Sequence, residues 1–307
     1  MSDQKVIGVD IGGSHITSAI VDLNELQIIE GSTYSVKVDN KGSKDYIFKC
    51  WSKALNQSIK CLDNQDGIRL GFAMPGPFNY KNGMGMFIGN NEKYESLNGV
   101  SIPDELSKYL RADKMDFRFL NDATAFGVGV ASRGKAKDYR KVVAITLGTG
   151  FGSAFLLNGV PQVTADNVPK GGFMWDKPYK LGLGDDYFST RWCIKRYKEF
   201  TGEETRGVKE IAEATNDFSR KVFVEFGSNM AEFMLPFLKK YQPDLLILGG
   251  NVSKANEFFL PALKNKINDA GLQVDFEISD VLEEAAIIGS AKLYDTDFWE
   301  QVKNVIY

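Results

Sequence analysis

Two glycine-rich turns, one in each half of the chain, have the residue types that bind phosphate groups. They lie in the segments "VIGVDIGGSHITSAIVD" and "VVAITLGTGFGSAFLLN". Glycine leaves backbone N–H groups uncovered, and a concave set of such donors binds phosphate oxygens. The candidate phosphate-binding residues are Gly12, Gly13 and Ser14 in the first turn and Gly148, Thr149 and Gly150 in the second.

The two segments superimpose, with Gly12 on Gly148 in the turn and Thr17 on Ser153 beyond it. Two such turns that face each other could hold one polyphosphate in a cleft. A turn this tight is expected to need positive φ at Gly148, which glycine adopts freely. A strand follows each turn, whereas a dinucleotide-binding fingerprint requires a helix there. The pattern therefore disfavours a dehydrogenase.

Asp10 ends the first predicted strand, directly before the first turn. A carboxylate beside bound phosphates would repel them unless Mg²⁺ bridged the two, directly or through water. The alternative is a tight hairpin in which Asp10 only accepts hydrogen bonds from the turn. Because the glycine turn occurs twice, we favour a site for Mg²⁺ at Asp10, with water between them.

The segment "FLNDATAFGVG" places Asn121 and Asp122 between a strand and a helix. Either side chain could simply cap the helix, and from this segment alone the cap is the safer interpretation. The functional interpretation is a general base, because phosphoryl transfer to an alcohol needs a carboxylate within reach of the attacking hydroxyl. The segment "LGGN" likewise ends a strand, where Gly249, Gly250 and Asn251 could approach a flat purine or could form a plain turn.

The order of predicted elements indicates an α/β fold. β-branched residues and turn signals predict strands at 6–10, 15–22 and 27–38, and helical periodicity follows at 43–62. The second half repeats this order of strands before helices, so we expect a duplicated mixed sheet.

Composition excludes several classes of function. The chain has 307 residues, a net charge of −3 and a hydrophobic fraction of 43%, which is typical of a soluble protein. Weak acidity argues against a nucleic-acid partner. Three scattered cysteines and the single His15 do not have the spacing of a zinc site, so we expect no zinc. With no signal peptide and no membrane-spanning run, we expect a cytoplasmic protein and no membrane partner.

Taken together, these segments resemble the ROK family of sugar kinases, in the actin-like ATPase superfamily. The similar motifs follow the family's order along the whole chain: "DIGGSHITSAIVD", "PGP", "NDATAFGVG", "LGTGFGSAF", "LILGGN" and "EEAAIIGSAKL". The resemblance implies two actin-like (ribonuclease H-like) lobes with a cleft between them. The small lobe would comprise residues 1–120 and 294–307, and the large lobe residues 121–293. It also implies ATP and Mg²⁺ as cofactors, and homodimers are common in the family.

The resemblance assigns a role to each motif. Asp122 would be the catalytic base, and the glycines of "LGGN" would line the adenine. The implied sugar-side residues are Gly76, Asn121, Gly172 and Asp176.

Three departures from the family pattern concern the sugar and zinc sites. The cysteine-rich zinc loop is missing, and "NNEKYESLNGVSI" replaces the usual sugar segment, which leaves its asparagine open among Asn90, Asn91 and Asn98. The expected Glu and His after the second turn are replaced in "KGGFMWDKPY", where Phe173 and Asp176 stand.

The sequence therefore predicts an ATP-dependent kinase that transfers the γ-phosphate to a hydroxyl of a hexose or related sugar. The alternative is a non-catalytic sugar or nucleotide sensor on the same fold, which the altered sugar loop would suit. A DNA-binding repressor of the family is a third class, and we disfavour it because the few residues before Val6 leave no room for a helix-turn-helix.

Overall fold

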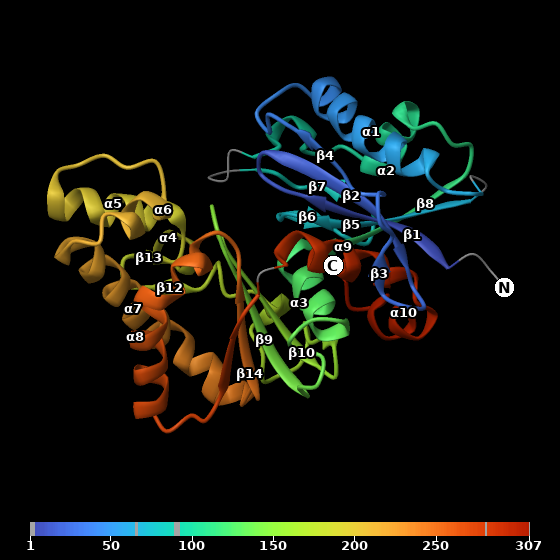
Figure 1. Cartoon of the computed structure of the whole chain (residues 1–307). Helices are drawn as coiled ribbons and strands as arrows, with labels where there is room; N and C mark the ends of the chain where they lie inside the picture. Colours follow the sequence, from blue (N-terminus) through green and yellow to red (C-terminus); the bar gives the residue numbers. More distant parts are fainter. Residues whose placement is uncertain (1–3, 65–66, 89–92, 280, 307) are drawn as a thin grey trace. The chain divides into compact units, whose positions relative to one another are not determined.

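The computed structural model describes residues 4–64, 67–88, 93–279 and 281–306 (Figure 1). The chain divides into two compact units. The first comprises residues 1–137 and 283–307, and the second comprises residues 138–282. Each unit has its own main sheet and its own hydrophobic core.

Six strands form the main sheet of the first unit, namely β1 (Lys5–Ile11), β2 (His15–Asp22), β3 (Gln27–Ile28), β4 (Tyr34–Lys37), β5 (Ile68–Met74) and β8 (Met115–Asn121). Their order is β3-β2-β1-β5-β8, with β4 also paired to β2. β1 and β2 form an antiparallel hairpin, whereas β5 and β8 run parallel to β1. The carboxyl ends of β1, β5 and β8 therefore lie at one edge of the sheet. A separate small hairpin consists of β6 (Phe78–Asn79) and β7 (Met84–Gly85).

The second unit repeats the five-strand order of this sheet, without a strand equivalent to β4 among the described residues. Its strands are β9 (Lys141–Leu147), β10 (Phe151–Leu157), β11 (Val160–Pro161), β14 (Leu245–Gly249) and β15 (Asp275–Ile278). Their order is β11-β10-β9-β14-β15, with β9 and β10 antiparallel and β14 parallel to both β9 and β15. The duplicated mixed sheet predicted from the sequence is confirmed.

Helices cover both faces of the first sheet (Figure 1). They are α1 (Lys44–Lys60), α2 (Ile102–Leu106), α3 (Asp122–Ser132), α9 (Leu282–Ala291) and α10 (Thr296–Val302). α1 begins at Ser43, whose side chain accepts a hydrogen bond from the N–H of Tyr46. Its apolar side, which includes Trp51, packs in one core with Ile7 and Val9 of β1.

The helices and hairpin of the second unit are α4 (Gly184–Tyr187), α5 (Thr190–Thr201), α6 (Val208–Glu213), α7 (Asp217–Tyr241), α8 (Asn256–Asp269), β12 (Pro178–Tyr179) and β13 (Gly182–Leu183). Residues of α7 and α8 pack with β9 and β14 in the second core. Short 3-10 turns complete the two units, namely η1 (Glu95–Leu97), η2 (Ser107–Tyr109), η3 (Lys170–Gly172), η4 (Val252–Ala255) and η5 (Lys292–Tyr294).

Glycines allow α9 to lie unusually close to its neighbours. A β-carbon placed on Gly71 of β5 would lie 2.2 Å from the carbonyl oxygen of Ser290, and one on Gly129 of α3 would lie 1.9 Å from that of Ala285. No real β-carbon fits at such distances, so the backbone of α9 lies directly on the sheet and on α3.

This packing explains why the compact units differ from the lobes expected from the sequence. Those lobes divide the chain after residues 120 and 293, whereas the compact units divide it after residues 137 and 282. Because α3 and α9 pack on the first sheet, both helices belong to the first unit. The lobe boundaries drawn from the duplication stay a prediction.

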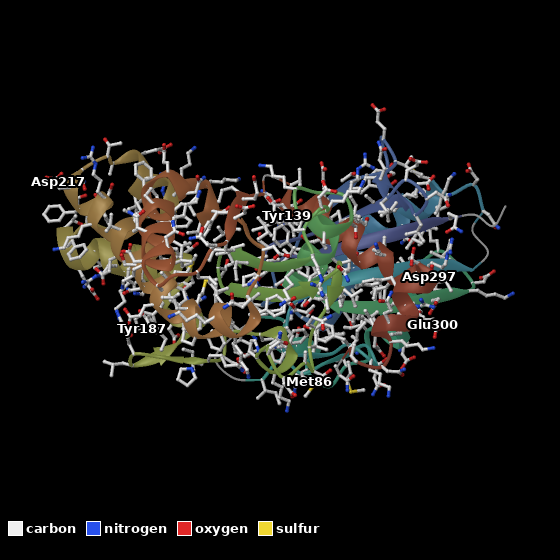
Figure 2. The ribbon with its side chains drawn as sticks, turned by 90° about the horizontal axis from the view of Figure 1, so that it is seen from below. Met86, Tyr139, Tyr187, Asp217, Asp297 and Glu300 are labelled. Atoms are coloured by element: carbon white, nitrogen blue, oxygen red, sulfur yellow. The ribbon has the colours of Figure 1, made fainter. Side chains whose placement is uncertain are left out.

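The C-terminal segment also packs on the first sheet, as the resemblance implies. Arg118 of β8 stacks on the rings of Tyr294 and Trp299, with the guanidinium 4.4 and 4.0 Å from the two ring centroids. Asp297 and Glu300 lie on the exposed side of α10 (Figure 2).

One local prediction is wrong, and two short helices were missed. The strand expected at 27–38 is interrupted, because Gly31 has positive φ (75°) and the hydroxyl of Ser32 bonds the carbonyl of Ile29 at 2.6 Å. The short helices α2 and α6 were not predicted from the sequence.

Within the described residues, no helix is both long and apolar enough to cross a membrane.

We expect Gly129→Ala to destabilise the protein by about 3 kcal/mol, the upper end of ordinary overpacking effects, because the new methyl group collides with backbone. The better helix propensity of alanine would by itself favour the substitution by about 1 kcal/mol. Urea unfolding measures the difference. Gly207→Ala is the matched control, since no atom lies within 4 Å of its β-carbon position. Equal midpoints for the two variants would contradict the proposed close packing of α3 and α9.

Candidate active site

The first glycine turn is closed by its own backbone and by a tyrosine. The N–H of Gly12 donates to the carbonyl of His15 at 3.0 Å, and the hydroxyl of Tyr94 donates to the carbonyl of Gly12 at 2.7 Å. The side-chain amide of Asn40 donates to the carbonyl of Gly13.

The last carbonyl of the turn, that of Ser14, accepts a hydrogen bond from the N–H of Val38 at 2.9 Å. Every carbonyl of the turn is therefore bonded within the first unit. Among the described residues, the N–H groups of Gly13 and Ser14 have no hydrogen-bond partner. Two adjacent unpaired N–H groups form the kind of donor pair that binds an anion.

The second turn has the same arrangement, built from different residues. The N–H of Gly148 donates to the carbonyl of Gly150 at 3.0 Å. The carbonyl of Gly148 accepts from both the N–H and the hydroxyl of Thr190, at 2.8 and 2.9 Å, and that of Thr149 accepts from Arg191 at 2.7 Å. In the part of the chain that the structure describes, the N–H groups of Thr149 and Gly150 are unpaired.

The two turns differ in length by one residue. Ile11 pairs with Ile16 across the first turn, whereas Leu147 pairs with Phe151 across the second. The sequence superposition is therefore correct before the turn. After the turn, equivalent residues are displaced by one position, so Thr17 does not match Ser153.

The positive φ expected at Gly148 is wrong, because this glycine is not among the residues with left-handed backbone. A β-carbon on Gly148 would meet no atom within 4 Å. The second turn therefore leaves open space beside Gly148, rather than requiring glycine for its backbone conformation.

Asp10 and Asp122 lie at the same edge of the first sheet. Asp10 pairs with Ala73 at the carboxyl end of β5, and Asp122 follows the carboxyl end of β8. Burial, together with the negative charges of Asp122 and Glu283, raises the pKa of Asp10 to about 8. Within the described chain, its carboxylate accepts no hydrogen bond.

A partly buried carboxylate with acidic neighbours and no hydrogen-bond donor fits a cation. The described residues contain no cluster of three His, Cys, Asp or Glu side chains able to enclose a metal by themselves. Mg²⁺ is often held by one or two carboxylates together with water and substrate phosphates, so Asp10 suits Mg²⁺ of this kind.

Asn121 caps α3, as the simpler interpretation predicted. Its side-chain oxygen accepts from the N–H of Thr124 at 3.2 Å, and its amide nitrogen donates to the hydroxyl of Tyr80 at 3.1 Å. These bonds fix the start of α3 and thereby the position of the next residue, Asp122.

Asp122 is partly buried, and its Oδ1 accepts from the N–H of Ala123 at 2.8 Å. The carboxylate keeps lone pairs for a further donor. Burial raises its pKa, while the Ala123 N–H and the charge of Lys93 lower it. Gly76 follows β5 at the same edge, with its β-carbon position 3.4 Å from the hydroxyl of Tyr80.

In the second unit, Gly249 ends β14 beside Thr146 of β9, and Gly250 and Asn251 follow it. Gly250 has φ of 96°, and its β-carbon position lies 2.3 Å from the carbonyl oxygen of Leu147. Only glycine fits at position 250. This agrees with the plain turn that the sequence analysis gave as the alternative to a purine contact. Contact with adenine stays a prediction.

The expected sugar residues of the second unit have local partners. Both backbone groups of Gly172 are bonded, the N–H to Pro169 and the carbonyl to the hydroxyl of Ser153. Asp176 is exposed and forms an ion pair with Lys177 at 2.7 Å. Asn98 is exposed, and Asn90 and Asn91 lie outside the described residues. The cleft expected between two lobes also stays a prediction.

Comparison with known proteins identifies the family. A model described as the ROK family matches residues 6–174. The chain belongs to the ROK family. Glucokinase of Thermotoga maritima is 24% identical, over 95% of this chain and 98% of that protein. N-acetyl-D-glucosamine kinase of Haemophilus influenzae is 26% identical, over 80% of this chain and 84% of that protein.

A solved ROK glucokinase from Streptomyces griseus, in complex with glucose and AMPPNP, has the same fold. It is 19% identical, with a TM-score of 0.73 over 94% of this chain and 98% of that chain. The family and fold predicted from the sequence are confirmed.

Several polar residues at the two turns of this ROK chain were missed by sequence reasoning. In the first unit, Glu283 of α9 bonds His15 at 2.9 Å and lies near Asp10. In the second unit, Asp185 accepts from the N–H of Phe151 at 2.7 Å and from Arg191 at 2.8 Å. Glu283 begins the segment "EEAAIIGSAKL", but nothing in that segment places it at the first turn, and no motif marks Asp185. Both residues reach the turns only through the fold.

We expect Asp10→Asn to change how stability depends on pH in metal-free protein. The native pKa of Asp10, about 8, lies above its ordinary value of 3.8, so folding takes up a proton between these values. Stability from this group is therefore lost as pH rises, by up to about 1.4 kcal/mol per pH unit, until the native pKa is passed.

Urea unfolding between pH 5.5 and 8.5 with a chelator measures this dependence. The variant should gain stability over the unsubstituted protein as pH rises. A stability difference that stays constant with pH would show that Asp10 is not the titrating group.

We expect Gly148→Val to weaken ATP binding by about 10- to 100-fold, the loss of one charge-assisted hydrogen bond. The valine side chain would fill the open space beside the unpaired N–H groups, and the fold should persist. Calorimetry measures the affinity and urea unfolding measures the stability, with Gly207→Val as control. Unchanged ATP affinity would remove the second turn from the nucleotide site.

Proposed function

We propose that this chain is an ATP-dependent kinase that phosphorylates a hydroxyl of a hexose or an N-acetylhexosamine. One observation carries the proposal: a partly buried carboxylate, Asp122, lies at the same sheet edge as a turn with two unpaired N–H groups. Family membership and relatives named glucokinase and N-acetyl-D-glucosamine kinase support this reaction class.

Asp122 acts as the general base in the proposed reaction. The proton of the sugar hydroxyl passes to its carboxylate while the sugar oxygen attacks the γ-phosphorus of ATP. The bond between that phosphorus and the β–γ bridging oxygen breaks, and ADP leaves. A carboxylate whose pKa is raised by burial accepts a proton more readily than an exposed one, which suits a base near neutral pH.

The glycine turns bind the phosphates through their unpaired N–H groups. These donors are already oriented, because every turn carbonyl is bonded elsewhere. Asp10 would hold Mg²⁺, which when bound neutralises phosphate charge. Preoriented donors lower the barrier because they need no rearrangement as charge moves during transfer.

The remaining predicted contacts complete the proposal. Gly249, Gly250 and Asn251 would line the adenine, and the sugar would meet Gly76, Asn121, Gly172 and Asp176. We further propose a cytoplasmic homodimer with no zinc and no nucleic-acid partner.

A second candidate is a non-catalytic sensor of sugar or nucleotide. The observation that favours it is in the sugar loop, where the side chain of Phe173 offers no hydrogen-bond acceptor and Asp176 is already paired with Lys177. A coupled ADP-release assay with glucose, N-acetylglucosamine and N-acetylmannosamine separates the two functions. The kinase releases ADP with at least one sugar, whereas the sensor binds ligands without turnover.

We expect Asp122→Asn to lower kcat by about 10² to 10⁴-fold, the usual contribution of a general base. The amide keeps the shape of the carboxylate and cannot take the proton. ATP affinity, measured by calorimetry, should stay within a few-fold. Asp113→Asn, an exposed carboxylate of the same unit, is the control and should leave kcat unchanged.

Near-normal turnover by Asp122→Asn would exclude this residue as the base. A parallel loss of folding stability would instead be detected by urea unfolding, so the two explanations are separable.

A further inference from the structure

Lys93 lies beside the first glycine turn, in the segment that replaces the family's usual sugar motif. A β-carbon placed on Gly13 would lie 3.7 Å from Cε and 3.9 Å from Nζ of Lys93. The lysine ammonium is therefore close to Gly13, one of the two turn residues whose N–H groups are unpaired among the described residues. A phosphate oxygen bonded to such an N–H, at about 2.9 Å, is within reach of a flexible lysine side chain.

The next residue anchors Lys93 at this place. Tyr94 is fully buried, its hydroxyl bonds the carbonyl of Gly12 at 2.7 Å, and its N–H bonds the carbonyl of Asn40 at 2.9 Å. The ring of Tyr94 contacts Trp51 edge-on, with 5.6 Å between centroids. The backbone at Lys93 is thus tied to the same turn whose amides are unpaired.

The charge environment of Lys93 points to a missing anion. Its side chain is partly buried, and no described residue forms a hydrogen bond or an ion pair with its ammonium. The positive charge nevertheless acts on Asp122, whose pKa it lowers. Lys93 is therefore near both the phosphate turn and the carboxylate, the two groups that would flank a transferring phosphoryl group.

We propose that Lys93 binds the γ-phosphate of ATP and neutralises its charge during transfer to the sugar. This inference rests on the proposed kinase function and adds a residue to the same site. ADP lacks the group that Lys93 would bind, so the lysine should distinguish ATP from ADP. A role in which Lys93 only supports the fold would affect both nucleotides alike.

The test compares Lys93→Met and Lys93→Arg with the unsubstituted chain. Lys53→Met is the control, because Lys53 is an exposed lysine on α1 of the same unit. Calorimetry gives the affinities for Mg·AMPPNP and Mg·ADP, and a coupled assay gives kcat and the sugar KM. We expect Lys93→Met to weaken AMPPNP by about 10- to 100-fold, the loss of one charge-assisted hydrogen bond, with ADP affinity unchanged.

In the same variant we expect kcat to fall by at least about tenfold, with sugar KM unchanged, and Lys93→Arg to restore part of both losses. Equal weakening of AMPPNP and ADP, or normal binding of both, would overturn the proposal. If the unsubstituted chain binds AMPPNP but phosphorylates no sugar, the kinase function fails. The comparison of AMPPNP with ADP would still decide whether Lys93 binds the γ-phosphate.

Discussion

Every carbonyl oxygen in the two glycine turns is bonded inside its own unit, whereas two adjacent N–H groups in each turn have no partner among the described residues. The donors that tie these carbonyls differ between the turns: Tyr94 and Asn40 in the first, Thr190 and Arg191 in the second. The two sheets share one five-strand order, but the supporting side chains differ. Fixed N–H donors are what a phosphate-binding site requires, so these supports matter as much as the glycines themselves.

Negatively charged side chains gather at the edge of the first sheet where β1, β5 and β8 end. Asp10 and Asp122 lie there, and burial together with the negative charges of Asp122 and Glu283 raises the pKa of Asp10. Two features of the fold bring these carboxylates together. The parallel strands β1 and β8 end at one edge of the sheet, and glycines let α9 approach closely enough to place Glu283 there. A cation and a lysine ammonium both reduce this repulsion.

Much of the fold and part of the site could be predicted from the sequence. The repeated strand–turn–strand segments predicted the duplicated sheet, and Asn121 and Asp122 were placed correctly because a strand end and a helix cap are local signals. The packing of α9 on α3 depends on Gly129 and Gly289, whose neighbours are distant in sequence. Such long-range contacts also position Lys93, Asp185 and Arg191, which carry no local motif. The backbone of Gly148 was misjudged for another reason: this glycine leaves space for a ligand and needs no special φ.

Amide NMR tests most directly whether the unpaired N–H groups bind phosphate. With glycine, serine and threonine labelled, Mg·AMPPNP should shift the amide protons of Gly13, Ser14, Thr149 and Gly150 downfield. Gly12 and Gly148 should shift less, because their N–H groups are already bonded to His15 and Gly150. Nucleotide binding that leaves the four unpaired amides unchanged would contradict the account.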